Sequence, residues 1–539
     1  MDQTAHVDTF VRDNLPPGHL WPHLDLTQPP LSRYPAQLNC AVALLDAAVA
    51  DGHGDRPCLY FEGGQWSYAE LLERANRIAR TLTEELDLEP GNRVLLRGPN
   101  TPELAAIWFG VIKAGGICVT TMPLLRAREI GVILERARVR LALCDQRCAE
   151  DLHGAVAGCA SPVRTVLFDP RGESGELEEL AKGRDNTFPG VRTLADDPAL
   201  IAFTSGTTGR PKATVHFHRD VMAICDSFPV STLKAQASDI FCGTPPFAFT
   251  FGLGGLLLFP IHLRAATLLL EKATPEELMA AIARWRATVC FTSPTGYRAM
   301  SALVERYDVS SLRRCVSAGE TLPLATFEAW QRATGLALID GIGATELLHI
   351  FISASDEAIR PGSTGRALPG YEARVVDREG REVPRGTVGL LAVRGPTGCR
   401  YLDDLERQQE YVRDGWNYTG DAYVQDTEGY FWYQARADDM IISSGYNIAG
   451  PEVENALLLH AGVRECGVVG IPDEERGQIV KAFVVLRDPA LASPELIKEL
   501  QDHVKREIAP YKYPRAIEFV AVLPRTETGK LQRFRLRTG

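Results

Sequence analysis

Residues 204–212 have the sequence Thr-Ser-Gly-Thr-Thr-Gly-Arg-Pro-Lys, and the apolar stretch Ala-Leu-Ile-Ala-Phe at 199–203 comes directly before them. Because such a run predicts a buried strand, the nine residues form a loop at the carboxyl end of that strand. Gly206 and Gly209 let the backbone approach an anion closely. Five side chains can donate to a phosphate, namely Thr204, Ser205, Thr207, Thr208 and Lys212. In isolation such a cluster is more often a polar surface turn, and its spacing excludes the GxxxxGK[ST] phosphate loop.

Helical and strand-like patterns alternate on both sides of this loop. The helical spacings are at 69–86, 102–116, after residue 218, 275–287 and 321–333. Strand-like apolar runs lie between them, at 92–98, 116–121, 199–203, 287–293 and 313–319. The alternation predicts a large N-terminal domain of layered α/β sheets with largely parallel strands.

The character of the chain changes after about residue 360. Short β-like runs rich in Gly and Arg occupy 362–433 and predict a smaller β-rich subdomain attached to the α/β core. The last hundred or so residues predict a small α+β unit with two helices, near 451–460 and 494–508, among three strands. We place the boundary near Arg436, which divides the chain into domains 1–436 and 437–539.

The composition of the 539 residues restricts the function classes. A net charge of −11 argues against nucleic-acid binding, which needs clustered Lys and Arg. There is no apolar run of about 18 residues and no basic N-terminal segment before an apolar run, so neither membrane spanning nor secretion is expected. The 12 cysteines lack the paired spacing of a zinc site and favour a reduced, cytoplasmic location.

The loop and four later motifs together resemble the adenylate-forming superfamily of acyl-CoA synthetases, nonribosomal adenylation domains and luciferases. The later motifs are Gly341-Ile-Gly-Ala-Thr-Glu346, Thr419-Gly-Asp421, Arg436 in Ala-Arg-Ala-Asp-Asp, and Pro524-Arg-Thr-Glu-Thr-Gly-Lys530. They follow in the order expected for that superfamily, so the resemblance covers nearly the whole chain. It implies ATP as a substrate, Mg²⁺ as a cofactor and a small C-terminal domain that is mobile.

The resemblance implies roles for the residues of each motif. Glu346 would bind Mg²⁺, and Thr345 would hydrogen-bond the α-phosphate or the carboxylate under attack. Asp421 would accept both ribose hydroxyls, and Arg436 would lie beside the ribose and phosphate. The adenine would lie against two short segments, Ser317-Ala318-Gly319-Glu320 and Asp340-Gly341-Ile342, and Gly343 would also belong to the nucleotide site. Lys530 would bridge the carboxylate and the α-phosphate and stabilise the charge of the transition state.

Three features bear on the second step, in which a thiol takes the acyl group. Asp438 matches the family's hinge, about which the small domain rotates. Gly445 matches the glycine that lets the narrow pantetheine arm of coenzyme A pass. The family usually has glycine where Ala435 precedes Arg436, and we expect the added methyl group to be tolerated.

The segment Phe247–Phe259, rich in aromatic residues and glycine, would line the acid pocket in this resemblance. Amino-acid-activating relatives usually have Asp at the position of Ala248, so an α-amino acid is not expected. Six residues would surround the ring of an aromatic acid: Thr250, Phe251, Phe259, Gly343, His349 and Ile350. The segments around Gly445 and Phe249 look most similar to 2-aminobenzoate (anthranilate) CoA ligases, and Thr250 and His349 could pair with an ortho-amino group.

The resemblance therefore implies an ATP-dependent aryl-CoA ligase for 2-aminobenzoate or a similar benzoate. Two alternatives stay open, a benzoate-CoA ligase and an enzyme that loads the aryl group onto a carrier protein. A third, a non-catalytic homologue, predicts loss of Glu346, Asp421 or Lys530, and all three residues are present. A monomer and a homodimer both fit the sequence.

Overall fold

The computed structural model describes residues 4–204, 211–436, 439–443, 446–473, 476–525 and 531–537, with only the backbone of 446 and 447. Several predicted site residues lie outside these ranges: Ser205, Gly206, Thr207, Thr208, Gly209, Asp438, Gly445 and Lys530.

The first sheet has six strands, parallel except for the last pair. In spatial order they are β6 (Arg164–Phe168), β5 (Leu141–Asp145), β3 (Arg93–Arg97), β4 (Ile117–Thr121), β7 (Pro198–Thr204) and β8 (Lys212–Phe217). Alternate residues of β3 enter different cores, since Val94 packs with one group of helices and Leu95 with another. Helices therefore cover both faces, as the buried β3 requires: α2 (Tyr68–Glu84) and α3 (Pro102–Lys113) on one, and α4 (Ala127–Arg136) and α5 (Ala149–Ala157) on the other.

The second sheet has nine strands with a parallel centre and antiparallel edges. Its order is β15 (Arg366–Ala367), β14 (Ile350–Ser353), β13 (Leu338–Gly343), β12 (Arg314–Ala318), β11 (Val289–Thr292), β9 (Ile240–Gly243), β10 (Ala266–Leu268), β1 (Pro57–Phe61) and β2 (Gly64–Ser67). Three helices pack on one face, α11 (Pro275–Trp285), α12 (Pro294–Ser301) and α13 (Leu324–Thr334). The other face meets the core shared with the first sheet. The predicted layered α/β architecture is confirmed.

The predicted β-rich subdomain is an antiparallel sheet. Its strands are β16 (Glu372–Val376), β17 (Val388–Arg394), β19 (Trp416–Gln425), β18 (Val412–Arg413) and β20 (Phe431–Arg436), with α14 (Leu405–Tyr411) beside them. Short helices complete the N-terminal part: α1 (Phe10–Asp13), α6 (Glu176–Ala181), α7 (His218–Asp226), α8 (Phe228–Ser231), α9 (Thr250–Leu253) and α10 (Phe259–His262).

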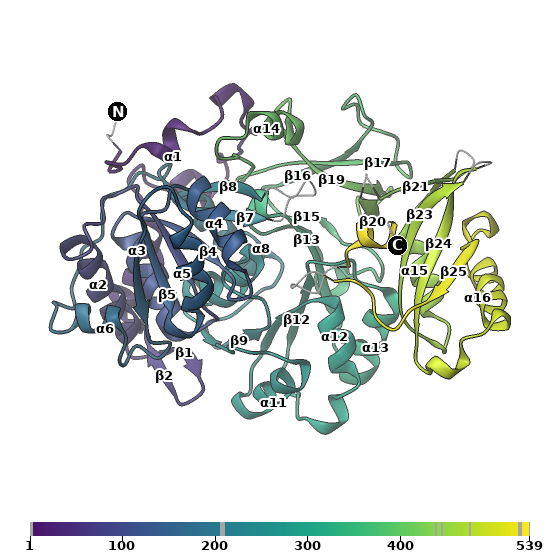
Figure 1. Cartoon of the computed structure of the whole chain (residues 1–539), viewed down its shortest axis with the longest axis horizontal. Coiled ribbons are helices and arrows are strands. Elements are labelled where there is room, and N and C mark those ends of the chain that lie inside the picture. Colours follow the sequence, from purple (N-terminus) through teal and green to yellow (C-terminus); the bar gives the residue numbers. More distant parts are fainter. Residues whose placement is uncertain are drawn as a thin grey trace.

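The C-terminal part is the expected α+β unit, with one more strand pair than the sequence indicated. Its sheet contains β22 (Tyr446–Ile448), β21 (Ile441–Ser443), β24 (Gly477–Leu486), β23 (Val463–Asp473) and β25 (Ala516–Phe519). Its helices are α15 (Gly450–Leu458), α16 (Pro494–Glu507) and α17 (Arg533–Arg537). The unit has its own core, and α15 lies against α13 and β20 of the larger part (Figure 1).

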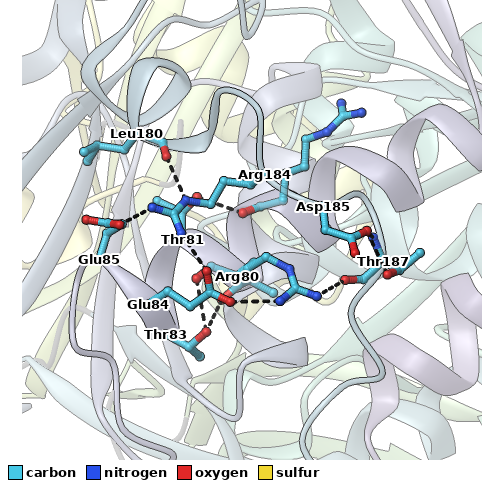
Figure 2. Close-up of polar contacts among 11 residues, drawn as sticks. Arg80, Thr81, Thr83, Glu84, Glu85, Leu180, Arg184, Asp185 and Thr187 are labelled. Carbon is cyan, nitrogen blue, oxygen red and sulfur yellow. Dashed lines mark hydrogen bonds and ion pairs between the residues drawn. The ribbon is translucent and has the colours of Figure 1, made fainter.

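Surface ion pairs join the end of α2 to the segment that follows α6. Arg80 contacts Glu84 at 2.8 Å, and Arg184 reaches the same carboxylate at 2.6 Å and pairs with Glu85 as well (Figure 2). Exposed pairs of this kind each contribute about 1 kcal/mol or less, so they fasten a loop and do not determine the fold. Within the described ranges, no helix is long and apolar enough to cross a bilayer.

Candidate active site

The two described ends of the phosphate loop face each other across a strand pair. Thr204 ends β7 and Lys212 begins β8, and they are direct partners in the antiparallel register. The loop therefore connects two hydrogen-bonded strands, a connection that the pattern of apolar residues did not reveal. Lys212 Nζ lies 5.7 Å from the ring centroid of Tyr401, a residue of the segment before α14.

The segments expected at the adenine leave the carboxyl ends of two neighbouring parallel strands. Ala318 ends β12 and pairs with Gly341 of β13, and Gly319 follows with a φ of +91°, a conformation that favours glycine. Burial raises the pKa of Asp340 to about 8, and its Oδ1 has no hydrogen-bond partner within the described part of the chain. Such an orphaned acceptor suits a ligand that brings a donor.

Thr345 and Glu346 lie in the 3-10 turn Thr345–Leu347, which is held from two directions. The hydroxyl of Tyr401 donates to Glu346 Oε1 at 2.6 Å, and both residues are buried. On the other side, His216 Nε2 lies 2.7 Å from the carbonyl oxygen of Thr345 and donates to it, because a carbonyl can only accept.

A fully buried ion pair lies behind this turn. Arg400 Nη1 contacts Asp220 Oδ2 at 2.9 Å, and Asp220 Oδ2 is 3.8 Å from His216 Nδ1. Burial alone would raise the pKa of Asp220, but the charge of Arg400 holds it well below its usual value. Arg400 also lies over the ring of Phe217 at 4.2 Å, which partly replaces lost hydration.

Asp421 and Arg436 are opposite each other on β19 and β20. Their side chains form an ion pair at 3.1 Å, and Arg436 also donates to the carbonyl oxygen of Thr419. Burial nevertheless raises the pKa of Asp421 above its usual value. Ala435 stands where the family usually has glycine. Its methyl group is accommodated, because the residue is buried in β20 opposite Ala422.

Aromatic rings enclose His349. The ring centroids of Phe259, Phe228 and Phe251 lie 4.5, 5.7 and 5.8 Å from its own. Burial lowers the pKa of His349 to about 3, so the imidazole is neutral at physiological pH. Both of its nitrogens are buried without a hydrogen-bond partner among the residues that the structure describes.

One cleft of about 1890 Å³ brings these groups together. Its lining includes seventeen predicted site residues: Thr204, Lys212, Thr250, Phe251, Ala318, Gly319, Glu320, Asp340, Gly341, Ile342, Gly343, Thr345, Glu346, His349, Ile350, Asp421 and Arg436. Phe259 is not among the lining residues; it is fully buried behind His349. The C-terminal unit contributes further lining residues, including Glu465, Lys512 and Arg525.

Sequence reasoning missed two residues that support this site. Tyr401 and Phe228 carry no motif signal, and only tertiary contacts bring them to Glu346 and His349. His216 and His218 alternate in Val-His-Phe-His, and one of them was expected to border the acyl or pyrophosphate site while the other packs or meets solvent. His216 contacts the carbonyl oxygen of Thr345, whereas His218 begins α7 and lies 3.2 Å from the sulfur of Cys40.

Comparison with known proteins identifies the family. The AMP-binding enzyme model matches residues 46–400, and the model of the C-terminal domain of AMP-binding enzymes matches 452–530. The benzoate–CoA ligase of Thauera aromatica is 34% identical over 95% of this chain and 98% of its own. The crystal structure of the anthranilate CoA ligase AuaEII in complex with anthranoyl-AMP superposes with a TM-score of 0.89, at 34% identity, over 94% of this chain and 98% of that one.

A benzoate CoA ligase from Burkholderia xenovorans superposes with a TM-score of 0.84 at 31% identity, over 93% of this chain and 99% of that one. The mixed α/β fold with its smaller C-terminal part is thus the fold of adenylate-forming enzymes. The chain belongs to the AMP-binding enzyme family.

We expect the Asp220–Arg400 pair to be required for stability. Asp220→Ala leaves the buried guanidinium of Arg400 without its carboxylate, which should lower the free energy of unfolding by roughly 3–5 kcal/mol. Denaturant unfolding measures the loss. The control is Asp308→Ala, which removes an exposed pair with Arg286 and, like Asp220→Ala, one hydrogen bond from a backbone N–H. The two side chains of the control pair are 60% and 59% exposed, so its loss should cost less than about 1 kcal/mol. Similar losses in the two variants would contradict the assignment.

Proposed function

We propose that the protein is an ATP-dependent aryl-CoA ligase whose preferred acid is 2-aminobenzoate or a benzoate of similar size. In the first step the acid attacks the α-phosphate of ATP, forming the aryl-adenylate and releasing pyrophosphate. In the second step coenzyme A takes the aryl group and AMP is released. One observation carries this proposal: His349, which is neutral and surrounded by aromatic rings, lines the same cleft as Lys212, Glu346 and Asp421.

The pocket chemistry favours a small aromatic acid with a polar substituent. Phe251 lines the cleft and offers a flat apolar surface to a ring, while Phe228 is buried and packs against His349. Since both nitrogens of His349 lack partners, an ortho-amino group could satisfy one of them. Leaving such a buried group unpaired costs about 1–3 kcal/mol, so unsubstituted benzoate should be the weaker substrate. Relatives named for benzoate and for anthranilate support both acids as candidates.

The nucleotide would occupy the other lobe of the cleft. Asp421 is suited to accept hydrogen bonds from the ribose hydroxyls, and Arg436 beside it balances the negative charge of its carboxylate. Asp340, with its unpaired Oδ1, is suited to the amino group of adenine, beside Ala318 and Gly319. Lys212 and the loop 205–209 would bind phosphate, and Lys530 would stabilise the transition state.

The site fits Mg²⁺ held by a single carboxylate. No group of three or more His, Cys, Asp or Glu side chains in the described ranges could hold a metal ion by itself. Mg²⁺ commonly takes one or two carboxylates and completes its shell with water and substrate phosphates. Glu346 is that carboxylate, and when bound the ion neutralises phosphate charge. Tyr401 donates a hydrogen bond to one carboxylate oxygen of Glu346 and thereby orients the other oxygen.

The second step involves residues outside the described ranges. We assign Asp438 as the hinge between domains 1–436 and 437–539, and Gly445 as the passage for the pantetheine arm. Free coenzyme A is the proposed acceptor because the Thauera aromatica relative and AuaEII, which match over nearly the whole chain, are named as CoA ligases, with a carrier protein as the alternative. Twelve free thiols are consistent with a cytoplasmic enzyme.

The proposal predicts a definite order of substrates. With ATP, Mg²⁺ and coenzyme A, kcat/KM should be highest for 2-aminobenzoate, about 5- to 150-fold lower for benzoate, and far lower for a medium-chain fatty acid. Thioester formation with benzoate, 2-aminobenzoate, salicylate and octanoate measures it. A preference for octanoate would overturn the aromatic assignment, and turnover only with a carrier protein would overturn the choice of acceptor.

A substitution at Gly254 tests the acid pocket and should leave the nucleotide site unchanged. It lies in the turn Gly254–Leu258, where an added Cβ would be 2.5 Å from His349 Cδ2 and 3.1 Å from the ring of Phe259. Gly254→Ala should therefore displace His349 and lower kcat/KM for the aromatic acid about 10-fold or more. The KM for ATP should change less than about 2-fold. Gly131→Ala, whose Cβ meets nothing within 4 Å, is the matched control and should leave both constants unchanged.

Tyr401→Phe tests the support of the metal ligand. The ring remains, but Glu346 loses its 2.6 Å hydrogen bond, so the free Mg²⁺ needed for half-maximal ATP–pyrophosphate exchange should rise about 10-fold. Tyr371→Phe, which removes an equally buried hydroxyl contact with Thr397 at 2.8 Å, should leave the Mg²⁺ requirement unchanged. An unaltered requirement in Tyr401→Phe would refute this role.

A further inference from the structure

Four charged side chains form a series of ion pairs where the two parts of the chain meet. Arg298 on α12 and Glu320 after β12 belong to the larger part, and Glu465 on β23 and Arg525 belong to the C-terminal unit. Arg298 Nη2 is 3.2 Å from Glu465 Oε1, Arg525 Nη2 is 2.9 Å from Glu465 Oε2, and Arg525 Nη1 is 3.5 Å from Glu320 Oε1. Positive and negative charges thus alternate, and two of the three pairs cross between the parts.

The environment makes these pairs stronger than ordinary surface pairs. The four side chains are only 15–32% exposed, so salt and water screen them less than they screen exposed charges. Burial tends to raise the pKa of Glu465, yet Arg525 and Arg298 hold it below its usual value. Arg298 also donates to the carbonyl oxygen of Arg464 at 3.4 Å, a second contact across the same boundary.

Two members of this series, Glu320 and Arg525, are connected to segments that the proposed reaction uses. Glu320 belongs to the segment assigned to adenine, and its other oxygen accepts from Thr295 at 2.8 Å. Arg525 directly precedes the segment 526–530, which ends in Lys530, and it forms a β-bridge with Leu531 on the far side of that segment. Fixing Arg525 therefore fixes its bridge partner Leu531 as well.

We propose that Arg298, Glu465 and Arg525 are positioning residues for adenylation: with Glu320 they hold the C-terminal unit against the larger part in the arrangement that the first step needs. The inference rests on the proposed function, in which Lys530 acts in the first step only. These side chains need not touch the substrate, because they act through the placement of the unit. They should matter for adenylation and not for transfer to coenzyme A.

The Arg298–Glu465 pair gives the sharpest test, because neither residue belongs to the nucleotide segments. Arg298→Gln, Glu465→Gln and the double variant are compared in two assays. The first is ATP–pyrophosphate exchange with 2-aminobenzoate and with benzoate. The second is single-turnover formation of the aryl-CoA from chemically synthesised aryl-adenylate and coenzyme A. Lys530→Ala marks the effect of removing the lysine itself.

Each single variant should slow exchange about 3- to 10-fold and leave thioester formation within about 2-fold of the wild type. The double variant should be no slower than Glu465→Gln alone, because Glu465→Gln already breaks the Arg298–Glu465 pair together with the Arg525–Glu465 pair. Raising ionic strength should slow exchange in the wild type more than in the variants. Lys481→Gln, which removes a 2.8 Å pair with Glu518 within the C-terminal unit, is the control and should match the wild type in both assays.

Three outcomes would overturn the inference: unchanged exchange in both single variants, equal slowing of both half-reactions, or additive effects in the double variant. Failure of the proposed function is distinguishable from these. It would appear as a wild-type protein that catalyses no exchange with either aromatic acid, whatever the variants do.

Discussion

The arrangement of the cleft depends on one buried ion pair, between Arg400 and Asp220. Both side chains are fully buried, and two charges in such a place are stable only when paired. Asp220 also faces His216, whose ring donates to the carbonyl oxygen of Thr345, and the next residue after Arg400 is Tyr401, whose hydroxyl donates to Glu346. Arg400 and Tyr401, which are consecutive, thereby position Thr345 and Glu346, the two consecutive residues expected to meet phosphate and metal.

This arrangement separates the residues that meet substrate from the residues that place them. Glu346 keeps one carboxylate oxygen for its ligand because Tyr401 takes the other. The packing around Tyr401 also explains why its hydroxyl stays protonated: burial and the neighbouring carboxylate raise its pKa far above the ordinary value. A permanent donor at that position keeps the carboxylate in one orientation whether or not a substrate is present.

Burial is used differently in the two lobes of the cleft. In the nucleotide lobe it raises the pKa of Asp340 and of Asp421, so each carboxylate gains from a ligand that brings hydrogen-bond donors. In the acid lobe burial lowers the pKa of His349 and leaves a neutral ring that can donate and accept. A protein with a net charge of −11 can thus bind anionic substrates, because local groups and not overall charge set the potential in the cleft.

The sequence by itself determined the fold class, the order of the motifs and most of the cleft. Apolar periodicity identifies a buried strand such as β3 and a helix such as α2, because local patterning reflects which face is covered. The motif residues, including Glu346 and Asp421, could be predicted because the short segments that contain them resemble the motifs of a known family. The substrate class followed from the segment around Phe251, read through family resemblance.

Only the tertiary structure decided which side chains support these residues. Tyr401 lies 55 positions after Glu346, and Arg525 lies 205 positions after Glu320, so no local pattern connects them. Phe259, which the sequence placed around the substrate ring, lies behind His349 because the turn Gly254–Leu258 directs it into the core. Contacts between residues far apart in sequence depend on how sheets and helices pack, and that packing is set by the whole chain and not by any one segment.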